Sequence, residues 1–167
     1  MKAIILITCF SMFLLGCSTH PQKESKTGEW RLPDKEDVID DWARFNSPNK
    51  VIDDFNGDGA KDVAQILLRK TSKIGYMLTV DLSNGKNYIL EQNENITPQG
   101  VSIELVEPSG DVWESACAKG YWDCSVNEIR QFKISKPSIQ FCYIESSCTI
   151  FMWSDRNSEF TRIPLSD

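Results

Sequence analysis

An Asp-rich stretch, Asp54-Phe55-Asn56-Gly57-Asp58-Gly59-Ala60-Lys61-Asp62, combines residue types and spacing that could do chemistry. Oxygen-bearing side chains occupy its first, third, fifth and ninth positions, and a glycine at the sixth position allows a sharp turn. Calcium is a hard cation that binds roughly six to eight oxygens, so alternate acids and amides on a turning backbone can converge on one ion. The stretch therefore predicts a calcium loop. The alternative is an acidic turn without metal, because Asp and Asn favour turns in any case.

The residues around this stretch, 51–66, resemble the calcium loops of FG-GAP and VCBS-type repeats. An EF-hand requires a Glu at the twelfth position, whereas that position here is Gln65, inside a predicted strand. The resemblance implies five ligands, four through their side chains and the alanine through its carbonyl oxygen: Asp54, Asn56, Asp58, Ala60 and Asp62. The motif occurs once here, whereas β-propellers of that family repeat it, so a propeller is not predicted.

Four cysteines lie in the C-terminal half of the chain: Cys117, Cys124, Cys142 and Cys148. In an exported domain an even set of cysteines usually forms disulfides. Zinc is the alternative, but the close pairs are separated by six and five residues, wider than zinc knuckles, and no His is nearby. Four cysteines allow three connectivities, which the sequence leaves open. Pairing within each close pair is preferred, because each pair flanks an apparent turn.

Three aromatic residues, Trp113, Tyr121 and Trp122, lie on the long loop that carries the first two cysteines. Aromatic side chains on a cross-linked loop are typical anchors of protein interfaces, because their conformation is already restricted before binding. This pattern predicts a partner-binding surface. The alternative is that the rings plug one end of a β core.

Catalysis is not predicted from the residue types present. The chain has one His, His20, which precedes the folded part, and this excludes triads and most zinc sites that depend on His. A carboxylate pair such as Glu114 and Asp123 could do glycosidase-type work, but the sequence does not define the separation of the two groups.

The first sixteen residues resemble the signal peptide of bacterial lipoproteins. Lys2 precedes an apolar stretch, residues 3–15, which is too short to span a bilayer as a stable transmembrane helix. The stretch ends in Leu14-Leu15-Gly16-Cys17, which resembles a lipobox and implies cleavage before a lipidated Cys17. Ser18 in place of Asp then implies sorting to the outer membrane. A plain secretory signal, or an uncleaved helix, with an ordinary thiol at Cys17 is the alternative.

Residues 17–29 are polar and are predicted to form a lipidated flexible tether, which leaves residues 30–167 as a single domain. A short N-terminal helix is predicted from Asp34, which can cap it, to about Phe45, since apolar residues recur at helical spacing. The remainder alternates with period two and has turn signals such as Asn84-Gly85. The predicted fold is mainly β, two antiparallel meanders forming a sandwich or open barrel, cross-linked by disulfides. Residues 63–68 are expected to form a strand buried on both faces.

The net charge of −6 argues against nucleic-acid binding and favours cations and basic proteins as partners. The lipobox, the calcium loop, the segment Gly120-Tyr121-Trp122-Asp123-Cys124 and the terminal Ser166-Asp167 together resemble small envelope lipoproteins of Gram-negative bacteria. Some of these act as immunity proteins against hydrolases that attack the envelope. The resemblance implies an outer-membrane lipoprotein facing the periplasm, which inhibits a basic envelope hydrolase. A structural or assembly lipoprotein without a toxin partner is the alternative.

Overall fold

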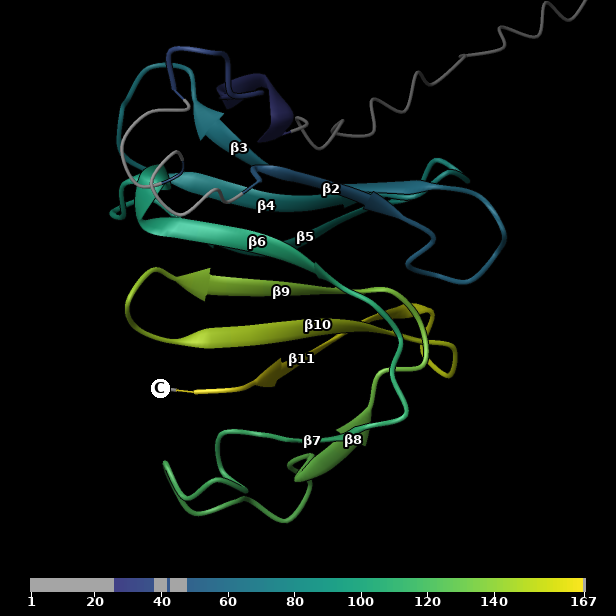
Figure 1. Cartoon of the computed structure of the whole chain (residues 1–167). Helices are drawn as coiled ribbons and strands as arrows, with labels where there is room; N and C mark the ends of the chain where they lie inside the picture. Colours follow the sequence, from purple (N-terminus) through teal and green to yellow (C-terminus); the bar gives the residue numbers. More distant parts are fainter. Residues whose placement is uncertain (1–25, 38–41, 43–47, 167) are drawn as a thin grey trace, which may run out of the picture.

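The computed structural model describes residues 26–37, 42 and 48–166, and these form a mainly β protein (Figure 1). The described residues include two short 3-10 turns, η1 (Lys26–Glu29) and η2 (Pro98–Gly100). The strands are β1 (Trp30–Arg31), β2 (Lys50–Asp53), β3 (Asp62–Arg69), β4 (Tyr76–Asp81), β5 (Asn87–Asn93), β6 (Val101–Val106), β7 (Val112–Glu114), β8 (Gln131–Lys133), β9 (Ser138–Tyr143), β10 (Cys148–Ser154) and β11 (Glu159–Pro164).

The strands form two antiparallel sheets and a small ribbon. The first sheet has the order β1-β3-β4-β5, with β2 also paired to β3, and the second has the order β11-β10-β9-β6. The ribbon consists of β7 and β8, which lie beyond the second sheet in Figure 1. Two meanders, β3-β4-β5 and β9-β10-β11, are thus present as predicted. The hairpin at Asn84-Gly85 is also confirmed, because the Gly85 amide bonds the Leu82 carbonyl at 2.9 Å and Gly85 has a positive φ of 85°.

One hydrophobic core lies between the two sheets. It contains fully buried residues from both, including Ile66, Leu78, Ile103 and Phe141. The sheets also approach each other at their sides, where β2 lies next to β6 and Tyr88 of β5 contacts aromatic rings of β10 and β11. The arrangement is a sandwich of two antiparallel sheets that contact each other through these strands and rings as well as through the core.

The burial of β3 and β4 differs from the prediction. The prediction of two buried faces for residues 63–68 is wrong, because burial alternates along β3 and its outer face is only half-buried. That outer face carries Gln65, whose amide group donates a hydrogen bond of 3.2 Å to the Asp81 carboxylate. The strand buried on both faces is β4, where Met77 and Thr79 are buried as well as the core residues.

The predicted N-terminal helix falls mostly outside the described residues. At its predicted start, the Asp34 carboxylate accepts hydrogen bonds from the Glu36 and Asp37 amides, at 2.9 and 3.3 Å. Trp42 has helical conformation and is buried, and its indole nitrogen donates to the Val101 carbonyl at 2.6 Å. No helix in the described residues has both the length and the apolar character needed to cross a bilayer. Cys17 and the tether up to residue 25 lie outside the described residues.

Candidate functional site

The predicted calcium loop, residues 54–62, is the turn that joins β2 to β3 and is called the Asp loop below. Asp53 and Asp62 are register partners in the two strands, so the residues between them form a hairpin connection at the edge of the first sheet. Gly57 and Gly59 have positive φ angles of 76° and 90°, which glycine adopts without the steric cost of a Cβ atom. The sequence therefore contains the residues that this tight loop requires.

The first carboxylate of the Asp loop organises its turn. Asp54 accepts hydrogen bonds from the amides of Gly57, Asp58 and Gly59, at 2.8, 3.0 and 2.8 Å. The Asn56 side chain accepts a hydrogen bond from the Asp58 amide at 2.9 Å and donates one to the Asp58 carboxylate at 2.8 Å. Hydrogen bonding from Asn56, and then from the Ala60 amide, lowers the pKa of Asp58. Most hydrogen bonds to these two carboxylates thus come from the loop itself, and the Ser83 hydroxyl donates one more to Asp58, at 3.3 Å.

Asp62 closes the Asp loop from inside the protein. Its side chain is fully buried, and one carboxylate oxygen accepts hydrogen bonds from the Phe55 and Asn56 amides, at 3.0 and 3.4 Å. The other oxygen accepts from the Ser83 amide, at 2.9 Å, in the β4–β5 turn. No described Lys or Arg forms an ion pair with Asp62, so backbone amides stabilise its charge. Asp62 therefore links two hairpin turns of the first sheet.

A lysine links the Asp loop to the second sheet. Lys136 precedes β9, and its ammonium group donates to the Asn56 carbonyl at 2.8 Å and pairs with Asp155 at 2.5 Å. A Cβ atom at Gly57 would lie 2.8 Å from the Lys136 Cε atom. The loop is thus held from two sides, and sequence reasoning missed Lys136 because no local pattern relates positions so far apart.

The Asp loop has donors that match calcium, but they are not assembled as a cage. Carboxylate, amide and carbonyl oxygens are the ligands that Ca²⁺ prefers. Within residues 26–37, 42 and 48–166, however, no three His, Cys, Asp or Glu side chains converge into a group that could hold a metal ion. The carboxylates of Asp54, Asp58 and Asp62 instead face amide groups. The donor set fits the ion in its chemistry, and one oxygen of each carboxylate, Oδ2 of Asp54 and Oδ1 of Asp58 and Asp62, accepts a single hydrogen bond.

Both disulfides join the close pairs that the sequence analysis preferred. Cys117 is bonded to Cys124, with a Cα–Cα distance of 5.0 Å. Cys142 is bonded to Cys148 across register partners of β9 and β10, with a Cα–Cα distance of 4.1 Å. Zinc is thereby excluded for these four cysteines, because both pairs are covalently bonded.

The first disulfide closes a projecting segment, residues 112–133, which is called the arm below. The arm consists of β7, β8 and the cross-linked loop between them, and Figure 1 shows it beyond β11. It is attached to the second sheet by a hydrogen bond of 2.8 Å from the Ala116 amide to the Pro164 carbonyl. Trp113 and Phe132 pack against a second hydrophobic cluster that includes Ile150.

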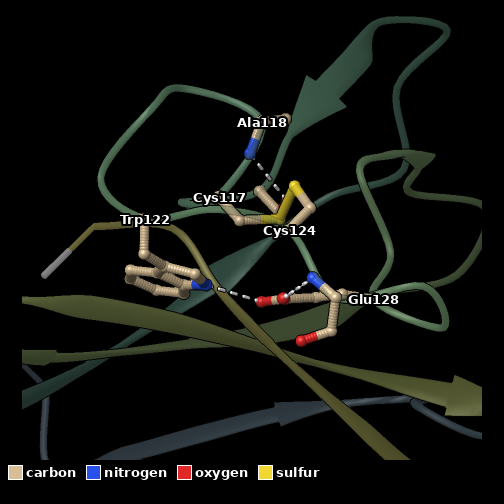
Figure 2. The surroundings of a disulfide bond; sticks show 7 residues. Cys117, Ala118, Trp122, Cys124 and Glu128 are labelled. Carbon is tan, nitrogen blue, oxygen red and sulfur yellow. Dashed lines mark hydrogen bonds between the residues drawn. A yellow bond between two sulfur atoms is a disulfide. The ribbon is translucent and has the colours of Figure 1, made fainter.

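The three predicted partner-binding rings have different positions on the arm. Trp113 is half-buried and lies against Phe132, with ring centroids 6.3 Å apart, and both rings pack against the second hydrophobic cluster. Tyr121 is 49% exposed and Trp122 is 37% exposed. Figure 2 shows that the Trp122 indole nitrogen donates to Glu128, at 3.0 Å, beside the Cys117–Cys124 disulfide. The arm thus presents two of the three rings to solvent.

Exposed apolar side chains are concentrated on the arm. Nine large hydrophobic residues are exposed in the described part of the chain, and five of them belong to the arm: Val112, Tyr121, Trp122, Val126 and Ile129. Val126 is 101% exposed, which is extreme for an apolar side chain. Sequence reasoning missed the three aliphatic residues, because the residues around an isolated Val or Ile do not indicate whether its side chain is exposed.

A pocket of about 640 Å³ lies on the arm beside the disulfide. It is lined by Glu114, Cys117, Ala118, Gly120, Trp122, Asp123, Cys124, Arg130 and Gln131. The structure thus brings together Glu114 and Asp123, whose separation the sequence left undefined. Both are exposed, and the Gln131 amide group donates to Glu114 at 3.2 Å.

Comparisons with protein-family models, with curated proteins and with solved structures found no match.

Proposed function

We propose that this chain is a lipid-anchored envelope protein whose arm binds and blocks a basic hydrolase, with calcium stabilising the domain through the Asp loop. The observation that supports a binding function is the concentration of exposed apolar side chains on the arm. Isolated exposed hydrophobics are normal on soluble domains, whereas a clustered set is typical of a protein interface. The lipid anchor at Cys17 and the outer-membrane location come from the lipobox resemblance alone.

The arm has the properties of a preorganised interface. The Cys117–Cys124 disulfide closes its loop, and Glu128 orients Trp122 while also accepting a hydrogen bond of 3.0 Å from the Ser125 amide. Binding to such a surface costs little conformational entropy, because the side chains and the loop are already restricted. Trp and Tyr are also the residues most often found as energetic centres of interfaces.

The same surface supports binding more than catalysis. A carboxyl group that acts as a general acid is usually enclosed by apolar surroundings. Glu114 and Asp123 are instead exposed to solvent where they line the pocket on the arm. The overall charge of −6 gives the protein a long-range attraction to basic partners, which favours their association rate.

Calcium has a supporting role in this proposal. Figure 1 places the Asp loop, between β2 and β3, on the first sheet, and the arm beyond the second sheet. The ligands would be Asp54, Asn56, Asp58, Asp62 and the carbonyl of Ala60. Calcium at this position would neutralise the clustered acids and fix the loop. It would act on the stability of the domain and would not contact the partner.

The experiment is capture of candidate basic peptidoglycan hydrolases, lysozyme-like enzymes included, by the full-length chain purified in detergent. We expect one hydrolase to bind and to lose its activity on cell walls. Trp122→Ala should weaken that binding about thirtyfold, the effect of a typical interface hot spot, and Val126→Asp should also weaken it. Ile89→Ala is the matched control, since Ile89 is 55% exposed on β5, away from the arm.

Two results would contradict the proposal. Equal capture by the wild type and by both arm variants would place the interface elsewhere. Absence of inhibition by any basic hydrolase, together with a domain that calcium stabilises, would favour a structural lipoprotein without such a partner.

A further inference from the structure

The pocket on the arm has the composition of a cation-binding site. Glu114 lines it from β7 and Asp123 from the cross-linked loop, and Trp122 also belongs to the lining. Arg130 is the one basic residue in the lining. Neither Glu114 nor Asp123 forms an ion pair with Arg130 or with any other described residue. Two carboxylates therefore face the pocket without a cationic partner.

The walls of this pocket are held in place before any partner arrives. The disulfide ties Cys117 to Cys124, the residue directly after Asp123. Trp122 is oriented by its hydrogen bond to Glu128, as Figure 2 shows. Glu114 is a register partner of Gln131 in the β7–β8 ribbon and accepts its side-chain hydrogen bond. The carboxylates and the indole ring are thus presented by three restrained segments.

We infer that this pocket receives an arginine side chain of the bound protein. The inference rests on the proposed function, since it takes the arm as the docking surface. A guanidinium group is planar, bonds carboxylates through several N–H donors, and stacks on aromatic rings. A lysine would match the charge, but its ammonium group is not planar, so it would not stack on the ring, and it has fewer N–H donors for the two acids. The volume of about 640 Å³ accommodates one long side chain.

The test uses small probes, so it does not depend on finding the hydrolase. N-acetyl-arginine amide is titrated into the full-length chain in detergent micelles, and the Trp122 indole N–H signal is followed by NMR after assignment with Trp122→Phe. N-acetyl-citrulline amide is the matched neutral probe, because it has nearly the same shape without the charge. We expect the arginine probe to bind at least about tenfold more tightly, since only it gains charge-assisted hydrogen bonds to the two acids.

Three charge variants give the direction of the electrostatic effect. Glu114→Gln and Asp123→Asn should each weaken the arginine probe about threefold, the effect of one exposed ion pair. Arg130→Gln should tighten it by a similar factor, because a competing positive charge is removed. Glu104→Gln is the control, since Glu104 is an exposed acid on β6 that does not line this pocket.

The outcomes separate this inference from the proposed function. No response of the Trp122 signal to the arginine probe, equal binding of citrulline, or weaker binding after Arg130→Gln would each overturn the inference. Hydrolase capture that depends on Val126 would still support the arm as an interface in that case. Conversely, tight arginine binding without capture of any hydrolase would support the pocket and contradict the proposed partner.

Discussion

Replacing Asp62 by Asn removes one acceptor from a fully buried carboxylate while preserving its shape. The two carboxylate oxygens accept hydrogen bonds from three backbone amides, those of Phe55, Asn56 and Ser83. An Asn side chain has one oxygen and one NH₂ group, so whichever way it is oriented, its NH₂ group faces at least one amide N–H. The better orientation places the oxygen toward Phe55 and Asn56 and leaves the Ser83 amide without an acceptor.

The loss of stability expected for Asp62→Asn follows from the Ser83 amide that is left without an acceptor. Burying a donor without an acceptor costs about 1–3 kcal/mol, and hydrogen bonds to a charged group lie at the upper end of the usual range. We therefore expect Asp62→Asn to lower the free energy of unfolding by about 2–3 kcal/mol. For a domain of this size the melting temperature falls by about 3 °C per kcal/mol, which gives about 6–9 °C.

The assay is thermal unfolding of the full-length chain in detergent, followed by circular dichroism with a chelator present, so that metal binding does not contribute. Asp58→Asn is the matched control in the same loop. Asp58 is exposed, and its Oδ1 atom can still accept the Ala60 hydrogen bond as an Asn oxygen. The bond from the Asn56 amide group to Oδ2 is lost, but water can replace it at this exposed position, so the melting temperature should fall much less than for Asp62→Asn. If Asp62→Asn and the wild type melt at the same temperature in chelator, the hydrogen bonds from Asp62 to the two turns do not stabilise the domain and the reasoning is refuted.

Three further predictions concern the metal, the pH and the membrane. Millimolar calcium, about tenfold above a dissociation constant of about 10⁻⁴ M, should stabilise the wild type by about 1.4 kcal/mol relative to chelator, and Asp54→Ala should abolish this increment. Identical melting curves in both buffers would exclude a calcium site. The hydrogen bond from Arg31 lowers the pKa of Asp37 from 3.8 to about 2. Because the folded pKa is the lower one, this pair stabilises the domain above about pH 4, and the stabilisation is lost toward pH 2. Arg31→Gln should therefore reduce the fall in melting temperature between about pH 4 and pH 2. An unchanged pH profile would argue against a stabilising role of this pair. Cys17→Ser should abolish labelling by radioactive palmitate and release the protein from the membrane fraction, and persistent labelling would disprove lipidation at Cys17.

Local features of the fold could be predicted from the sequence because neighbouring residues produce them. The Asn84-Gly85 turn requires a positive φ that Gly85 adopts easily, and the alternating apolar pattern defines each strand without reference to the others. The disulfide pairs were favoured for the same reason, since Cys142 and Cys148 flank a short turn between two strands. Turn chemistry and residue spacing carry this information.

The burial of individual strands could not be predicted from their own residues. The run 63–68 has the apolar composition of a strand buried on both faces, yet β4 has that position. Burial depends on which strands flank a given strand and on what covers each face of its sheet. Neither quantity is encoded within a window of eight residues.

Some features of the candidate site follow from the sequence, and others depend on the tertiary structure. The sequence by itself determined the residues of the Asp loop, the even set of four cysteines and the aromatic character of residues 113–122, because these depend on residue types at short spacing. It favoured the two close cysteine pairs, and the structure decided between the three connectivities. Only the tertiary structure decided that Asp62 is buried under the β4–β5 turn, that Lys136 supports the loop from the second sheet, and that Trp113 faces the core while Trp122 faces solvent. The physical reason is that solvent exposure and contacts between sheets are set by how distant segments pack, and a linear pattern of residues does not specify that packing.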